Sequence, residues 1–268
     1  MKEIKGFLDY FDNPRQLSQF LRTAKTVQGT HGNDMIESDY MALEEGEDIV
    51  IKDFQAKLDA LENIQSRFCN TYNVVGSRID MSRAMTGNPK AMLYQEKRQK
   101  KSKDITLIID MTLPWHIPED TIKEIGGRVL SVLQKLMLEG NKIELYACCT
   151  GYINANFSNI MLIKLKNFDE YLELSRISYV LSNPSFLRHT FFQWNGTDKN
   201  IKYKRTLGKS MAFEYTITEL SQAFSIELQK KCLYVSFLNY EEIDFWSSDK
   251  LYDDLMSKYE TLDRTLNF

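Results

Sequence analysis

A strand–helix–strand pattern between residues 104 and 150 constrains the fold more than any other feature of this sequence. The apolar run Ile105–Ile109 has the length and composition of a buried strand. Residues 118–139 carry apolar side chains at helical spacing, and a second apolar run, Lys142–Thr150, follows a turn at Gly140. A crossover helix that joins two strands is the seed of a parallel sheet. The sequence therefore predicts an α/β fold with a Rossmann-like parallel sheet and flanking helices.

The rest of the chain predicts further elements around this unit. We expect strands at 72–76, 91–94, 160–165 and 233–238, and helices at 1–25, 49–68, 167–181, 185–194, 214–228 and 251–262. Residues 80–85 can form one or two helical turns capped by Asp80. The acidic stretch 44–48 is typical of a solvated turn. Segments 91–94 and 105–109 can form a hairpin with the charged run between them as its loop. We divide the chain into an N-terminal helical extension, residues 1–95, and an α/β core on which it packs, residues 96–268.

Two adjacent glycines, Gly126 and Gly127, stand inside the central helix. Each costs about 1 kcal/mol of helix stability relative to alanine. We expect the helix to accept this cost because it approaches the sheet closely there. A dinucleotide-binding or Walker loop would instead place its glycines between strand and helix, so these glycines do not indicate a phosphate site.

Composition and charge narrow the class of protein. The chain has 268 residues, of which 43% are hydrophobic, enough for a substantial core, and its net charge of −3 gives no overall preference for nucleic acid or anionic membranes. The sequence does not open with a signal peptide, and no apolar run reaches the roughly 18 residues of a membrane helix. The four cysteines form no C-x-x-C pair and are typical of reduced, packed thiols. We expect a cytoplasmic protein without a metal or another cofactor.

Polar residues follow the two central strands where each strand ends. Asp110 and Thr112 come after the first strand, and Thr150 ends the second. Open α/β folds usually place their sites at these strand ends. Oxygen ligands in this loop suit Mg²⁺, whereas the alternative is a structural aspartate that caps the loop through backbone N–H groups. Trp115 and His116 continue the loop, so these five residues are the interaction candidates.

The sequence contains no complete catalytic set. His116 lies close to Glu119 and Asp120, an arrangement that acid–base catalysis can use. The two carboxylates are equally ordinary first-turn residues that favour the helix dipole. No nucleophile of identifiable type accompanies the histidine. We therefore predict no catalytic residues, and a metal-dependent phosphoesterase built around Asp110 is a third alternative only.

Two basic segments, residues 97–103 and 199–209, are candidates for nucleic-acid contacts. Single-stranded nucleic acid is bound by positive charge together with aromatic stacking, whereas charge runs of this length are also typical of solvated loops. Convergence of the two segments would create a phosphate-binding groove. The candidate residues are Lys97, Arg98, Lys100, Lys101, Lys202, Tyr203, Lys204 and Arg205.

Several short motifs carry a resemblance to a known family. They are Thr26–Gly32, Gly76–Met81, Gly87–Pro89 with Met92, the strand ending at Asp110, Gly126–Leu130 and Lys142–Leu145. Over about residues 10–150 they resemble a family of uncharacterised proteins from tailed-phage genomes, whose core is similar to a degenerate von Willebrand factor A-like domain. The resemblance implies a phage origin and a Rossmann-like sheet, and von Willebrand factor A-like proteins mostly bind other proteins. Their metal loop has the pattern Asp-x-Ser-x-Ser, and Pro114 in the third place counts against metal-dependent binding.

These observations predict a phage-encoded, non-enzymatic binding protein that acts through protein–protein interaction during infection. Its interface would lie around Asp110–His116 and Thr150–Tyr152, and its partner would be a phage or host protein in the host cytoplasm or the virion. The alternative is a single-stranded nucleic-acid-binding protein of phage replication or transcription. Homo-oligomerisation stays open, and no membrane contact is expected.

Overall fold

A computed structural model describes most of the chain. The described residues are 6–25, 35–46, 68–75, 78–97, 103–113, 116–154, 157–170, 173–198, 217–228, 232–236 and 248–266. The strands are β1 (Leu8–Phe11), β2 (Phe68–Asn73), β3 (Arg78–Ile79), β4 (Met92–Lys97), β5 (Asp104–Asp110), β6 (Lys142–Asn154), β7 (Phe157–Lys166) and β8 (Cys232–Ser236). The helices are α1 (Pro14–Thr23), α2 (Glu37–Glu45), α4 (Met81–Met85), α5 (Glu119–Leu138), α6 (Leu174–Ser182), the π-helix η1 (Phe186–Thr190), α7 (Phe191–Asn195), α8 (Ile217–Phe224) and α10 (Ser248–Leu266).

The main sheet has five strands in the order β1-β7-β6-β5-β8. β5 pairs in parallel with β6, Ile105 opposite Ile143, and in parallel with β8 on its other side. This confirms the predicted strand–helix–strand unit, with α5 as its crossover. β7 returns antiparallel to β6, and β1 adds a parallel edge strand to β7. The protein is thus an α/β fold with a mixed, mostly parallel sheet and flanking helices.

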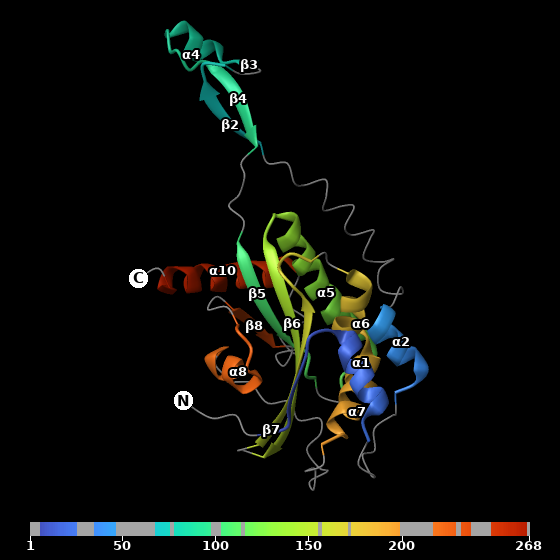
Figure 1. Cartoon of the computed structure of the whole chain (residues 1–268). Helices are drawn as coiled ribbons and strands as arrows, with labels where there is room; N and C mark the ends of the chain where they lie inside the picture. The colour runs from blue at the N-terminus through green and yellow to red at the C-terminus, as the bar shows by residue number, and fades with distance from the viewer. Residues whose placement is uncertain are drawn as a thin grey trace.

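Helices cover the two faces of this sheet unequally. Alternate β5 residues Ile105, Leu107 and Ile109 face the larger hydrophobic cluster, which also takes in the apolar sides of α1, α2, α5, α6, α7 and α10. Ile108 faces the opposite side, where α8 contributes Leu220 to a smaller cluster. Figure 1 shows α1, α2, α5, α6 and α7 together on one side of the sheet and α8 on the other. Both faces of β5 are therefore buried, as expected for its continuous apolar run.

The N-terminal part of the chain is not simply helical. The predicted helix over 1–25 is wrong at Leu8–Phe11, which form β1 and pair with β7. The helix begins at Pro14, where the Asn13 side chain accepts a hydrogen bond from the backbone N–H of Gln16. The predicted helix over 49–68 lies outside the described residues except Phe68, which begins β2. The division of the chain at residue 95 stays a prediction.

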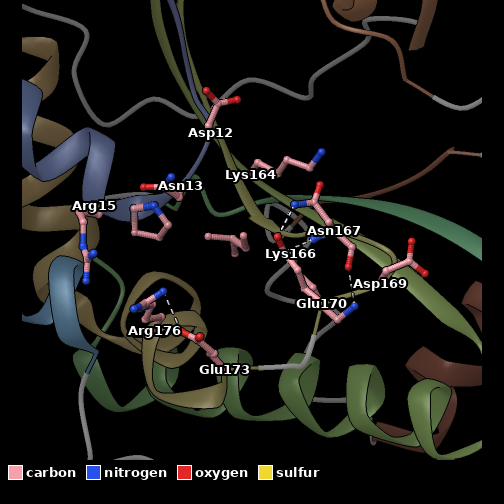
Figure 2. Close-up of a pocket in the computed structure, with 12 residues that line it drawn as sticks. Asp12, Asn13, Arg15, Lys164, Lys166, Asn167, Asp169, Glu170, Glu173 and Arg176 are labelled. Atoms are coloured by element: carbon pink, nitrogen blue, oxygen red, sulfur yellow. Dashed lines mark hydrogen bonds and ion pairs between the residues drawn. The ribbon is translucent and has the colours of Figure 1, made fainter.

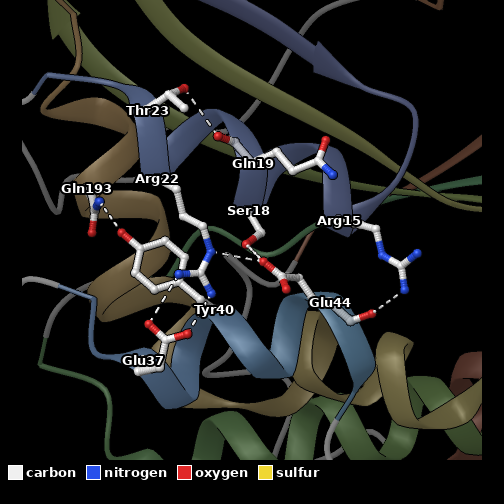
Figure 3. A network of polar contacts seen from close by, with 9 residues as sticks. All are labelled: Arg15, Ser18, Gln19, Arg22, Thr23, Glu37, Tyr40, Glu44 and Gln193. Carbon is white, nitrogen blue, oxygen red and sulfur yellow. Dashed lines mark hydrogen bonds and ion pairs between the residues drawn. The ribbon is translucent and has the colours of Figure 1, made fainter.

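The helix α2 replaces part of the stretch predicted as a solvated turn. Glu44 lies in its last turn and accepts hydrogen bonds from the side chains of Ser18, at 2.6 Å, and Arg22, at 3.0 Å. Arg22 also pairs with Glu37 at 2.7 Å, and Figure 3 shows its guanidinium between the two carboxylates. The contacts hold α1 against α2. Glu44 therefore belongs to an interhelical ion-pair network, whereas Glu47 and Asp48 lie outside the described residues.

A second, three-stranded sheet has the order β2-β4-β3 and carries the short helix α4. We call residues 68–97 the arm. Figure 1 shows it standing apart from the main sheet. β4 pairs antiparallel with β2 and β3, so the predicted hairpin of 91–94 with 105–109 is wrong. Both edges of β5 are already hydrogen-bonded, one to β6 and the other to β8, so β4 cannot pair with it.

Candidate functional site

The three polar residues predicted at the strand ends lie together in one buried hydrogen-bonded cluster. Asp110 Oδ1 accepts hydrogen bonds from the backbone N–H of Thr112, at 2.9 Å, and from its hydroxyl, at 2.5 Å. The Thr112 hydroxyl oxygen in turn accepts from the Thr150 backbone N–H at 2.7 Å and lies 3.1 Å from the Thr150 hydroxyl. Because the single Thr112 hydroxyl proton goes to Asp110, the Thr150 hydroxyl must be the donor to Thr112. All three residues are buried, so they cannot contact a partner directly in this conformation.

A fourth member of this strand-end cluster, Tyr234 on β8, was missed by the sequence analysis. Its hydroxyl donates a 2.6 Å hydrogen bond to Asp110 Oδ2. The strand had been predicted at 233–238, but only its pairing with β5 places the tyrosine beside the aspartate. The chain leaves β5 toward β6 on one side and reaches β8 on the other. Asp110 and Tyr234 thus occupy the topological switch point, where open α/β sheets place ligand sites.

Burial is the main cause of the shifted pKa of the Asp110 carboxyl. Removal from water raises the pKa of its carboxyl from 3.8 to about 6, although the hydrogen bonds from Thr112 and Tyr234 oppose that rise. Burial also raises the pKa of the neighbouring Cys148 and Cys149 thiols well above the usual range, so these thiols stay protonated and unreactive. Both carboxylate oxygens of Asp110 have donors inside the fold. The arrangement matches the loop-capping interpretation of this aspartate.

The remaining loop candidates are distributed differently. His116 is exposed, and Trp115 lies outside the described residues. Glu119 sits in the first turn of α5, as the capping interpretation predicts, and pairs with Arg188 at 2.7 Å. Arg188 also donates to the Ile117 carbonyl at 2.8 Å. The loop between β5 and α5 is thus tied to η1 as well as to the strand-end cluster.

The basic candidates fall almost entirely where the structure gives no description. Lys97 ends β4, but its side chain is not described, and Arg98, Lys100, Lys101, Lys202, Tyr203, Lys204 and Arg205 lie outside the described residues. Convergence of the two segments therefore stays a prediction. Arg83, on the arm, places its guanidinium 3.7 Å from the centroid of the Tyr72 ring. Arg78 lies on the same arm and is exposed.

The arm carries an exposed apolar surface that the sequence analysis did not identify. Met85 is 84% exposed and Val75 is 74% exposed. We call the five exposed aliphatic and thioether side chains the arm tip; they are Val74, Val75, Ile79, Met81 and Met85. The Asp80 carboxylate caps α4 by accepting from the Arg83 backbone N–H at 3.2 Å, which lowers the pKa of Asp80. The sequence predicts strands at 72–76 and 91–94 and a helical turn capped by Asp80 in this region. It does not predict that, within the described residues, no further layer covers these apolar side chains.

A cavity of about 750 Å³ opens between the start of α1 and the end of β7 (Figure 2). Its charged groups are largely paired with one another or with near neighbours. Arg176 pairs with Glu173 at 2.8 Å, and Lys164 pairs with Glu144 at 2.9 Å. Lys166 is buried and donates to the backbone carbonyls of Ile143 and Asn167 at 2.9 and 2.7 Å. The cavity therefore presents balanced charge and selects no ligand class.

Two features are absent from the part of the chain that the structure describes. No three or more histidine, cysteine, aspartate or glutamate side chains among them gather as metal ligands would. Among the same residues, no helix has both the length and the apolar character needed to cross a membrane.

Comparison with known proteins gives one family assignment. A model described as a domain of unknown function, DUF7192, matches residues 2–258, which include both the main sheet and the arm. No curated protein and no solved structure matches the chain. By the extent of this match, the chain belongs to the DUF7192 family of domains of unknown function.

Proposed function

We propose that this protein is a non-enzymatic binding protein that recognises a protein partner through the arm tip. The observation that carries the proposal is the concentration of exposed Val, Ile and Met side chains there. Soluble proteins seldom leave large apolar side chains gathered in one exposed place unless the place is an interaction surface. Methionine and arginine are both enriched in the cores of protein interfaces.

The energetics favour burial of this surface by a partner. Covering a Val, Ile or Met side chain contributes about 1.5–3 kcal/mol. Met85 and Val75 can contribute most of that range because most of their surface is still exposed to water before binding. Methionine also adapts its shape to irregular partner surfaces. The arm tip can therefore supply the apolar centre of a docking site.

The strand-end cluster has a supporting role in this proposal. The sequence analysis placed the interface around Asp110–His116, but Asp110, Thr112 and Thr150 bond to one another inside the fold. Their proposed role is to fix the loop that presents the exposed His116. The resemblance to von Willebrand factor A-like phage proteins belongs with this proposal: we infer a degenerate core of that type and a phage origin, with action in the host cytoplasm or the virion. An aspartate and two threonines joined at the strand ends support that inference.

Site-specific photo-crosslinking tests the proposal. A photoreactive amino acid replaces Met85 in one variant and Asp120, whose side chain is fully exposed on the main body, in the control. In cells that express the protein, Met85 should give discrete protein adducts on irradiation and Asp120 should give few or none. A folded Met85 variant without adducts would refute binding through the arm tip.

The alternative is a single-stranded nucleic-acid-binding protein. The contact of Arg83 with Tyr72, with exposed Arg78 and Lys90 on the same arm, favours it. Phosphate contacts make affinity fall log-linearly with salt. Filter binding of labelled single-stranded DNA and RNA across a salt series should then show that slope. Absence of binding at low salt removes this alternative.

A further inference from the structure

We propose that the partner of the arm tip is a second copy of this chain, which receives it on the exposed side of α2. This inference rests on the proposed function and names the partner at that same site.

Exposed apolar residues occur in two places only within the described side chains. One is the arm, and the other is α2 with the residue before it, where Ile36 is 60% exposed and Met41 is 40% exposed. Every other large apolar side chain that the structure describes is buried or half-buried. Each copy therefore has one exposed apolar surface on the arm tip and another on α2 with Ile36, which we call the platform.

The arm carries a net positive charge and α2 a net negative one. Residues 68–97 contain four basic and two acidic residues, a net charge of +2, so the remainder of a chain of net charge −3 carries −5. α2 has acids in its first turn and no base in its last turn, which contains Glu44 and Glu45. Arg22 neutralises part of this charge by pairing with Glu37 and Glu44. The exposed Glu45 adds to the negative end of the helix dipole, opposite in sign to Arg78 and Lys90 on the arm.

α2 is anchored firmly enough to act as a platform. Its buried Asp39 pairs with His189 Nδ1 at 2.9 Å and accepts a hydrogen bond from the Tyr179 hydroxyl at 3.3 Å. The opposite side of the helix is left to solvent, with Met41 on it. A fixed helix with exposed apolar and acidic residues loses little conformational entropy when a partner binds.

One arm and one platform per copy allow a reciprocal dimer. If the arm of each copy docks on α2 of the other, the same contact is made twice and a two-fold axis closes the assembly. Two-fold dimers are the commonest closed arrangement of identical subunits. The contact leaves neither apolar surface exposed.

Light scattering after size-exclusion chromatography of the purified full chain tests this, over about 1–100 μM. The wild type should form dimers. Met85→Glu on the arm and Met41→Glu on α2 should each weaken dimerisation about ten-fold or more, because a buried charge replaces an apolar contact. Gln222→Glu, an exposed position on α8, adds the same charge elsewhere and should change nothing. Circular dichroism checks that each variant is folded.

Mixing the two defective variants gives the decisive result. A single glutamate should be enough to break a contact, so each homodimer loses both contacts. In a mixed pair the second contact carries both glutamates, but the intact arm of Met41→Glu still docks on the intact α2 of Met85→Glu. Heterodimers should therefore form more readily than either homodimer. A wild type that stays monomeric overturns the inference, as does a dimer that both variants leave intact. Adducts of Met85 with other proteins only, from a chain that is monomeric when purified, would overturn the second-copy partner and leave the proposed function standing. A monomer that binds anionic vesicles through Met85 would assign the arm tip to a membrane and overturn both.

Discussion

Gly126 provides the sharpest test of the packing described above. The sequence analysis explained its presence in a helix by close approach to the sheet. The structure assigns the close approach to α6 instead: a Cβ built on Gly126 would lie 2.3 Å from the Leu181 carbonyl oxygen and 2.4 Å from Ser182 Cβ. Both neighbours belong to backbone or to a short side chain, so they cannot turn aside. Gly126→Ala therefore requires α5 and α6 to separate.

The size of the effect follows from two opposing contributions. Relief of such contacts means a helix shift of about 1 Å, and overpacking of this kind costs about 1–3 kcal/mol. Replacing a helical glycine by alanine returns about 1 kcal/mol through helix propensity. We expect a net destabilisation of up to about 2 kcal/mol, which lowers Tm by up to about 8 °C for a chain of this size. Gly126→Val, with a larger and β-branched side chain, should cost more.

Urea unfolding followed by far-UV circular dichroism measures the difference. Ser131→Ala, on the same helix and half-buried, is the control and should stay within about 0.5 kcal/mol of wild type. An increase in the free energy of unfolding for Gly126→Ala would refute the close approach, because it is the result expected at an uncrowded helical position.

Three further predictions concern the strand-end cluster, the cavity and the arm. The raised pKa of Asp110, about 6 against 3.8, favours the protonated carboxyl in the folded state, so the free energy of unfolding should fall by up to about 3 kcal/mol as pH rises from about 4 to about 6. Asp110→Asn should flatten that fall in urea titrations, and an unchanged pH profile would contradict it. Lys166→Met leaves the Ile143 and Asn167 carbonyls without their donor and should cost about 1–3 kcal/mol by thermal unfolding; no loss would show that the contacts are dispensable. Replacing residues 68–97 by a short Gly-Ser linker should leave the main fold and its cooperative unfolding intact, and an unfolded product would contradict an independent arm.

The central sheet was predictable because its signal is local. Ile105–Ile109 is apolar on both faces, which indicates a strand covered by helices on each side. The α5 pattern and the turn at Gly140, with φ +83°, fix the crossover and hence the parallel pairing with β6. Asp110, Thr112 and Thr150 were placed together by the rule that parallel strands end at one edge.

Other features depend on partners distant in the sequence. β1 is four residues long and pairs with β7 about 150 residues later, and no local pattern in Leu8–Phe11 contains that information. Tyr234 acts on Asp110 only because β8 crosses to the free side of β5. The exposure of Met81 and Met85 likewise depends on which distant segments pack near them. The sequence indicates a helical turn there but not its exposure, and within the described residues no further layer covers that side of the three-stranded sheet.

The separation of arm and body explains why their roles differ. Phe68 and Lys97 are directly paired across β2 and β4, so the chain enters and leaves the arm at one point, with Cα atoms about 5 Å apart. A segment whose two ends lie this close together can be inserted into a fold without disturbing its packing. The body, in contrast, uses its polar groups internally, since both Asp110 oxygens and the Lys166 ammonium are bonded within it. A partner that competed for those groups would have to break buried hydrogen bonds, whereas a partner at the arm tip displaces only water from Val, Ile and Met side chains.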